Sequence, residues 1–253
     1  MSSQPNPNAI ALPAELQTEI ENINKADKNN AYRPLKLFAV INKDRLWITQ
    51  QGSDEPLKKY EEMDVHIIAA KITRAAYTNR EQKAPSCVST DGGHTGTLHP
   101  EFGQLLEITG KDCDICPLNQ WGTGKDENGN PTRGKFCKER RNLLAMSPDF
   151  TDPLIVSLSP MSIGKWDAYA SGLTQLKPPS AYITQMTRIG VEVVTDAGRE
   201  FGTATFAAIG ALSTDAVRQA IELRKQYQNV IGGIVVAEPV ATTAPTSEEE
   251  LPF

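Results

Sequence analysis

Residues 159–176, "SPMSIGKWDAYASGLTQL", predict a helix, and the position of this helix among the strands is the best guide to the fold. Ser162 is the predicted N-cap, because a serine hydroxyl accepts a hydrogen bond from the free N–H groups of a first helical turn. Apolar side chains recur on one face of this helix at Ile163, Trp166, Ala170 and Leu173. We expect that face to pack on a sheet and to bury Trp166 in the core.

The segments on both sides of the helix have the composition of β-strands. On the N-terminal side, "LKLFAVI" and "RLWITQ" flank a tight "NKD" turn, a polar break follows at residues 50–62, and residues 63–78 form a long β-prone run. The segments "NLLAM" and "LIVSLSP" lead into the helix. On the C-terminal side, residues 180–195 and 201–210 predict a second hairpin, and residues 213–231 a closing helix capped by Ser213 or Thr214.

Without the stretch at residues 79–140, this order fits a mainly β (α+β) fold, a five-stranded barrel of the OB type with peripheral helices. In that architecture the helix lies between the third and fourth strands, although other small barrels also fit. We expect residues 1–30 to form an N-terminal arm with a short helix at 13–25, and residues 31–230 to form the OB-type domain. Residues 231–253 predict a disordered linker with an acidic tip.

The stretch at residues 79–140 is dominated by Gly, Asp, Asn, Pro and Thr, so it needs another source of order. All the cysteines of the chain lie in it, at Cys87, Cys113, Cys116 and Cys137. A C-x-x-C pair directs two thiolates to one metal ion, and we predict a structural Zn²⁺ held by all four cysteines. His94 or His99 in place of an outer cysteine, a redox or disulfide role, and free thiols are the alternatives.

Charge limits how this chain can bind nucleic acid. Lys and Arg total 26 against 31 Asp and Glu, for a net charge of -5, so binding must use local cations. Two stretches, "KITRAAYTNREQK" and "TRGKFCKERR", combine cations with aromatic residues, as single-strand binding requires. The predicted DNA contacts are Trp47, Lys71, Arg74, Tyr77, Arg80, Trp121, Lys135, Phe136, Lys138, Arg140 and Arg141. The alternative interpretation of "KERR" is an ordinary solvated surface.

Several other classes of protein are disfavoured. The chain has no H-E-x-x-H pair, nucleophile elbow or complete phosphate loop, so we expect no enzyme and no catalytic zinc. His66, within an apolar strand, is expected to be structural. No run of about 18 apolar residues suggests a membrane span, and no signal peptide is evident, so we expect a cytoplasmic protein.

The sequence ends in "EEELPF" after a Pro-, Ala- and Thr-rich linker. It resembles the tip of bacterial single-stranded DNA-binding proteins, in which acidic residues precede an aliphatic residue, Pro and a terminal Phe. The resemblance implies a docking peptide for replication and recombination proteins. The partner-binding residues that it implies are Glu248, Glu249, Glu250, Leu251, Pro252 and Phe253.

The middle of the chain resembles phage-type single-stranded DNA-binding proteins with a zinc-ribbon insert in an OB fold. "CVSTDGG", "CDICPLNQWG", "GKFCKERRNLLAM" and "LIVSLSPMSIGKWDAYASGL" carry the resemblance, which covers residues 63–210 and the last six. The leading hypothesis is therefore a sequence-tolerant single-stranded DNA (ssDNA) binding protein, located in the host cytoplasm if viral, with its oligomeric state open. A zinc-ribbon transcription cofactor or adaptor that acts through protein contacts is the alternative, and a nuclease is a third.

Overall fold

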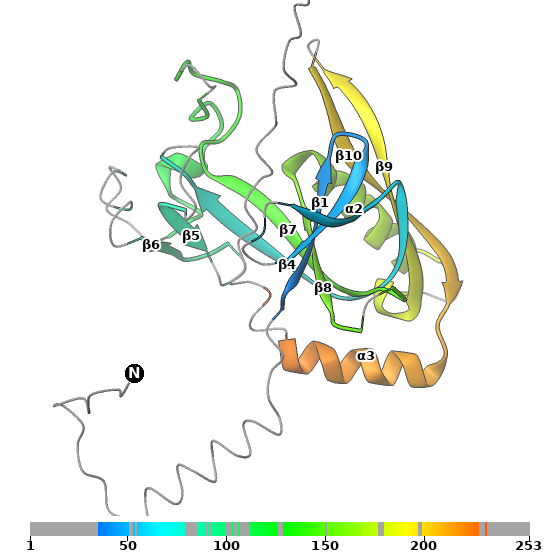
Figure 1. Cartoon of the computed structure of the whole chain (residues 1–253). Coiled ribbons are helices and arrows are strands. Elements are labelled where there is room, and N and C mark those ends of the chain that lie inside the picture. The colour runs from blue at the N-terminus through cyan, green and yellow to red at the C-terminus, as the bar shows by residue number, and fades with distance from the viewer. Residues whose placement is uncertain are drawn as a thin grey trace, which may run out of the picture. The chain divides into compact units, whose positions relative to one another are not determined.

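The strands form one sheet in the order β10-β9-β4-β7-β8-β1-β2-β3, with β5 and β6 added beside β4 (Figure 1). Neighbours in this order are antiparallel except β1 and β8, which are parallel. The strands are β1 (Leu37–Asn42), β2 (Arg45–Gln50), β3 (Pro56–Tyr60), β4 (Glu62–Ala76), β5 (Cys87–Ser89), β6 (Gly96–Leu98), β7 (Lys138–Met146), β8 (Leu154–Leu158), β9 (Gln185–Asp196) and β10 (Arg199–Ala211).

The computed structural model describes most of the chain from Leu35 to Ile231, which belongs to one compact unit. The described residues are 35–50, 53, 55–78, 85–89, 91, 93–99, 103, 106, 112–125, 129–149, 151–176, 180–196, 199–227 and 231. The predicted helix at 13–25, the predicted DNA contact Arg80 and the tail at 232–253 lie outside them. None of the helices in the described part of the chain combines the length and apolar character that a membrane-spanning helix needs.

The mainly β prediction is confirmed, and so are both hairpins and the long central strand. β1 and β2 pair across a tight turn in which Lys43 has a φ of 53°, and β9 pairs with β10. The predicted polar break at residues 50–62 is wrong in one respect, since it contains β3. β3 lies at the end of the sheet and exposes its central residues, and such an edge strand needs no buried apolar alternation in its sequence.

Two apolar clusters lie on opposite faces of the sheet. We call the cluster on the face of α2 (Pro160–Thr174) the inner cluster and the one on the face of α3 (Thr214–Tyr227) the outer cluster. Alternation along β7 separates them, because Leu143 packs in the inner cluster and Leu144 in the outer one. The inner cluster includes Trp166 of α2, which is 2% exposed, so its predicted burial is confirmed. The outer cluster includes Ala220 and Tyr227 of α3. Figure 1 shows α2 within the curl of the sheet and α3 outside it.

The caps of the two helices differ in how well the sequence indicates them. α2 begins at Pro160 after the N-cap Ser159, so the prediction of Ser162 as N-cap is wrong. Proline suits the first helical position because it lacks the N–H that would otherwise be unpaired there. Ser162 is instead buried, and its hydroxyl accepts a hydrogen bond from the Ala204 N–H at 3.0 Å. For α3, Ser213 is the confirmed cap, since its hydroxyl accepts from the Ala216 N–H at 3.3 Å.

The sheet curls until the end strand β10 approaches the β1–β2 hairpin. The backbone of Gly202 in β10 lies against Ile41 and the carbonyl group of Lys43, at the tip of the β1–β2 hairpin. A side chain at Gly202 would collide with that carbonyl oxygen. The sheet thus forms a strongly curled half-barrel, and the insert after β4 projects from one side of it (Figure 1).

Candidate nucleic-acid interface

The end of β4 brings together the segments that carry the cysteines. Cys87 begins β5 and pairs with Ala76 of β4, while Lys138, next to Cys137, pairs with Ala75 of the same strand. β5 and β7 therefore flank β4 on its two edges. Backbone hydrogen bonds join the C-x-x-C segment to the segments that hold the other two cysteines. The Cys113 N–H donates to the His94 carbonyl at 2.7 Å, and the Cys137 N–H donates to the Leu118 carbonyl at 2.8 Å. Residues that are remote in the sequence thus converge at one place.

Burial and neighbouring thiols both raise the pKa of two of the cysteines. Burial is the main cause that raises the pKa of Cys87 to about 11, and the nearby Cys113 and Cys116 thiols raise it further. Burial likewise raises the pKa of Cys137 to about 12, followed by the effects of the three other thiols. None of the four forms a disulfide. The disulfide alternative therefore has no bond to support it among these cysteines.

The described residues contain no set of three or more His, Cys, Asp and Glu side chains already arranged as a metal site. The chemistry of the converging groups nevertheless fits zinc, since four thiols from three segments match the donor type and number of a structural zinc site. Of the two histidines offered as alternative ligands, His94 has another side-chain contact: it is exposed, and its Nδ1 lies 3.4 Å from Asp114.

Arg74 lies beside this cysteine cluster and is held by protein groups. Its guanidinium donates to the Gly93 carbonyl, to Asp114 at 3.4 Å and to Glu139 at 3.4 Å. The side chain is only 14% exposed. The predicted DNA contact at Arg74 is thus a residue whose cationic group already has several partners within the fold.

Trp121 is the most exposed aromatic side chain among the described residues, at 76%. The Nζ atom of Lys135 lies 5.4 Å from the centre of its ring, in a cation–π contact. Backbone hydrogen bonds fix the loop, because the N–H groups of Gly122 and Gly124 donate to the Gly134 carbonyl at 3.0 Å and 2.8 Å. An exposed indole and a half-buried lysine that stands over its ring therefore lie together on a braced loop.

Asn119 connects this pair to the cysteine cluster. It is 7% exposed, at the end of the short helix η2 (Pro117–Asn119). Its Nδ2 group donates to the Cys113 carbonyl at 2.7 Å, and its Oδ1 atom accepts from Lys135 Nζ at 3.3 Å. One buried amide thus joins the C-x-x-C turn to the lysine that stands over Trp121.

A second tryptophan–lysine pair occupies the β2–β3 edge of the sheet. Trp47 of β2 lies opposite Lys59 of β3 in the antiparallel register, and Lys59 Nζ lies 4.7 Å from the indole centre. Both Leu46 and Ile48, its neighbours on the other face, are fully buried, so Trp47 does face away from the core as predicted. Lys59 is not among the predicted contacts, since "PLKKY" has no strand alternation to show which lysine meets the ring.

The basic run "KERR" does not form a single cationic patch. β7 begins at Lys138, and strand alternation sends its successive side chains to opposite faces. Lys138 is exposed, Arg140 is 6% exposed with a hydrogen bond to Ser157, and Arg141 pairs with Asp167 of α2 at 3.2 Å. Phe136, just before the strand, is half-buried, and its N–H donates to the Thr123 hydroxyl at 3.0 Å.

The remaining predicted contacts lie in β4, at Lys71, and directly after it, at Tyr77. Lys71 and Tyr77 are half-buried, while Thr73 and Ala75, which share their face by alternation, are 2% exposed each. A bulge at Ile67–Ala69 reverses the alternation of β4, so this face is the one that carries the outer apolar cluster. The sequence pattern could not reveal that reversal. The predicted partner-binding residues 248–253 lie outside the described residues.

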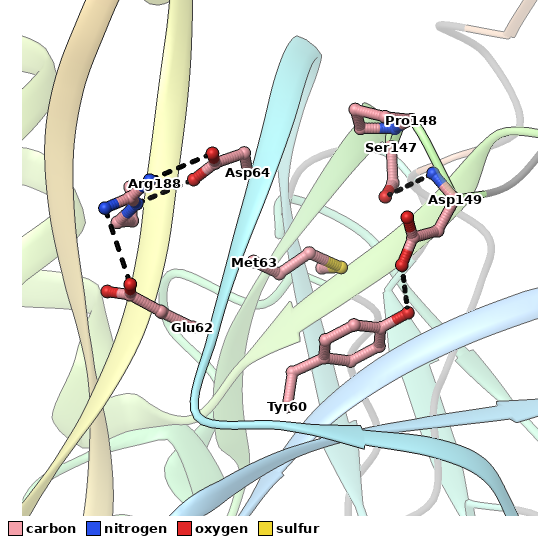
Figure 2. Close-up of a pocket in the computed structure, with 8 residues that line it drawn as sticks. All are labelled: Tyr60, Glu62, Met63, Asp64, Ser147, Pro148, Asp149 and Arg188. Carbon is pink, nitrogen blue, oxygen red and sulfur yellow. Dashed lines mark hydrogen bonds and ion pairs between the residues drawn. The ribbon is translucent and has the colours of Figure 1, made fainter.

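A pocket of about 300 Å³ lies away from the cysteines, between the starts of β4 and β9 and the end of β7 (Figure 2). Its charged lining is mainly acidic: Arg188 pairs with Asp64 and Glu62, and the Tyr60 hydroxyl donates to Asp149 at 2.5 Å. An acidic pocket repels a phosphate backbone, so the tryptophan–lysine pairs are the better candidate interface.

Asn119 and Lys59 are the two residues of this interface that the sequence did not indicate, since only the folded register brings each to its partner. No protein-family model, curated protein or solved structure matches the chain.

Proposed function

We propose that this chain is a sequence-tolerant ssDNA-binding protein. The observation that carries the proposal is the presence of two separate tryptophan–lysine pairs, Trp121–Lys135 and Trp47–Lys59. An exposed indole stacks on any base, and a neighbouring ammonium group neutralises a phosphate, so such pairs bind single strands with little sequence preference. Since Trp121 is 76% exposed, its ring remains accessible to a base while Lys135 lies over it.

The topology supports an OB-type core for this function. When β5 and β6 of the insert are set aside, the strands β4, β7, β8, β9 and β10 follow one another in the chain, and α2 lies between the third and fourth of them. In this interpretation the β1–β2–β3 segment extends the sheet beside β8, and the cysteine insert forms the connection between the first two strands of the core. OB-type folds bind single strands across their sheet and the loops beside it.

A structural Zn²⁺ is part of the proposal. Cys87, Cys113, Cys116 and Cys137 would hold it, and four thiolate ligands leave no open position for a reacting water. The ion would stabilise the insert that presents Trp121 and Lys135. Removing the ion with a chelator should then weaken ssDNA binding and lower the thermal stability of the protein.

Partner recruitment through residues 248–253 completes the proposal, on the strength of the resemblance of "EEELPF" to a docking tip. The protein would cover ssDNA through the body and present this peptide to replication or recombination proteins. Deleting residues 248–253 should leave ssDNA binding intact or tighter, because the deletion removes acidic groups that compete with DNA for cationic surfaces.

The test is a titration of fluorescent oligo-dT with the full chain and with the chain lacking residues 248–253, at several salt concentrations. We expect binding by both that weakens as salt rises, because cations on the protein replace counterions on the phosphates. Absence of binding to oligo-dT at low salt would overturn the proposal. Binding to duplex DNA as strong as to the single strand would also contradict it.

An adaptor that acts through protein contacts is the second candidate, and one observation favours it. Ile115, between the cysteines of the C-x-x-C pair, is 76% exposed, so the turn offers an apolar side chain to solvent. Tight capture of a polymerase by a protein that does not bind oligo-dT would favour this function over the first.

A further inference from the structure

We infer that Arg74 is a positioning residue for the cysteine cluster: its guanidinium ties the three cysteine-bearing segments together around the proposed zinc site. This inference rests on the zinc site put forward above, and it assigns Arg74 to support of the cysteine-bearing segments instead of to DNA contact.

The contacts of Arg74 carry the inference. Its hydrogen bond to the Gly93 carbonyl holds the loop between β5 and β6, and β5 carries Cys87. Its contact with Asp114 at 3.4 Å holds the C-x-x-C turn, since Asp114 lies inside that pair. Its contact with Glu139 at 3.4 Å holds the start of β7, two positions after the last cysteine. One side chain therefore reaches every segment that supplies a thiol.

The position of Arg74 in β4 explains this reach. In the strand register it lies opposite Ser89 of β5 on one side and Glu139 of β7 on the other. It is therefore the central member of a three-strand row at the base of the insert. Gly93 packs closely against the Arg74 side chain, because a Cβ at position 93 would lie only 3.1 Å from both Cζ and Nε of the arginine. The φ of 96° at this position also favours glycine.

The charge of Arg74 suits the same role. Four thiolates around one Zn²⁺ carry a net charge of about −2, and a buried cation beside them offsets part of it. The contact of the guanidinium with Asp114, inside the C-x-x-C pair, places this positive charge next to the cysteines. Arginine fits the position better than lysine, because its planar fork makes several directed hydrogen bonds at once, while a lysine ammonium is a point charge.

The rival role is a direct contact with DNA phosphate. The low exposure of Arg74, at 14%, and its two carboxylate partners argue against that role, since a phosphate would have to displace groups already bound to the guanidinium. The two roles differ in what a substitution changes: zinc retention in one case, and ssDNA affinity of a zinc-loaded protein in the other.

The experiment uses the full chain with the substitutions Arg74→Met and Arg74→Lys. Arg188→Met is the matched control, because Arg188 is also an arginine of the sheet paired with carboxylates, Asp64 and Glu62, but these partners lie in β4, away from the cysteine-bearing segments. Zinc per chain is measured by elemental analysis, and zinc affinity by competition with a chromophoric chelator. Co²⁺ substitution reports tetrahedral thiolate coordination by its absorption spectrum, independently of DNA binding.

We expect Arg74→Met to lower zinc affinity about 10- to 100-fold, the usual range for residues that orient metal ligands. Arg74→Lys should restore only part of this loss, and Arg188→Met should bind zinc like the wild type. Unchanged zinc affinity in Arg74→Met would overturn the inference, as would full rescue by lysine. Circular dichroism of Arg74→Lys shows whether the loss reflects the site or general unfolding, and a globally unfolded Arg74→Lys protein would count against a local role.

Failure of the inference and failure of the zinc proposal give different results. A wild-type protein that binds neither Zn²⁺ nor Co²⁺ overturns the zinc site and, with it, the role assigned to Arg74. A wild-type protein that binds Zn²⁺, with Arg74→Met equal to it in zinc affinity but weaker on oligo-dT, overturns only the present inference and favours DNA contact.

Discussion

Gly202 of β10 lies directly against the carbonyl oxygen of Lys43, in the turn between β1 and β2. Two hairpins from opposite ends of the described chain therefore meet where only a hydrogen atom fits. This contact closes the curl of the sheet and fixes how far β10 lies from the N-terminal hairpin.

Substituting Gly202 by alanine should destabilise the protein, because the new methyl group must displace the β1–β2 turn. Overpacking of this kind costs about 1–3 kcal/mol, and a backbone contact places the effect at the upper end. Urea unfolding measures it. The control is Gly164→Ala, at an exposed position of α2 where an added methyl group would meet open space, which should be neutral or slightly stabilising. Equal stability of the two variants would contradict the close contact.

Trp121→Ala and Trp47→Ala should each weaken ssDNA binding. Loss of one stacked base costs about 1–3 kcal/mol, or roughly 5- to 150-fold in affinity. The double variant should combine both losses if the two rings bind independently. Fluorescence anisotropy with labelled oligo-dT is the measurement, and Leu176→Ala, at another exposed apolar side chain, is the control. If neither tryptophan variant differs from that control, the rings do not contact the DNA.

Asn119→Ala should loosen Lys135 and so weaken ssDNA binding less than Trp121→Ala does. The substitution removes the acceptor of Lys135 and leaves the Cys113 carbonyl without the amide donor, so the insert should also lose stability. A double-mutant cycle of Asn119→Ala with Lys135→Ala measures the coupling in affinity. Strict additivity would show that the hydrogen bond between the two side chains does not support binding.

His66 should make stability depend on pH below neutrality. Burial lowers its pKa below the usual 6.5, against an opposing hydrogen bond in which Nε2 donates to the Ile183 carbonyl at 2.9 Å. The folded state therefore favours the neutral ring, and the unfolded chain takes up the proton first. This contribution to stability is complete above about pH 6.5 and is lost as the pH falls through the lower pKa of the folded state.

His66→Gln should remove that part of the pH dependence, because glutamine keeps a neutral donor for the Ile183 carbonyl at every pH. Urea unfolding of both proteins at about pH 7.5 and about pH 5.5, on either side of the ordinary histidine pKa, gives the comparison. We expect a smaller loss of stability on acidification in the variant than in the wild type. An identical loss in both would assign the pH dependence to other groups.

Most of the fold could be predicted from patterns that lie within single segments. The β1–β2 hairpin, the long β4 strand and Trp166 in the core follow from alternation or helical spacing of neighbouring residues. The edge strand β3 could not be predicted, because its partner β2 supplies the order that its own polar sequence lacks. The N-cap of α2 could not be assigned correctly, because two serines three positions apart, Ser159 and Ser162, offer the same local signal.

The candidate site was predictable in its residue types but less so in its contacts. C-x-x-C spacing indicated the cysteine cluster, and the Gly-rich surroundings of Trp121 indicated its exposure. The basic residues misled because their charge says nothing about strand facing: Arg74 and Arg141 both have carboxylate partners in the fold. Their placement depends on register and on the bulge in β4, which are tertiary properties.

The parallel pairing of β1 with β8 has a consequence for synthesis of the chain. Leu37 lies beside Leu154, so the first strand of the sheet to leave the ribosome must wait for a partner that is translated much later. Pairing of such remote segments is slow, and the waiting hairpin presents an open edge and apolar side chains to other chains. The insert lies between the two strands in the chain and lengthens the loop that must close. Newly made protein should therefore be most prone to aggregation in the interval before β8 is available to pair with β1.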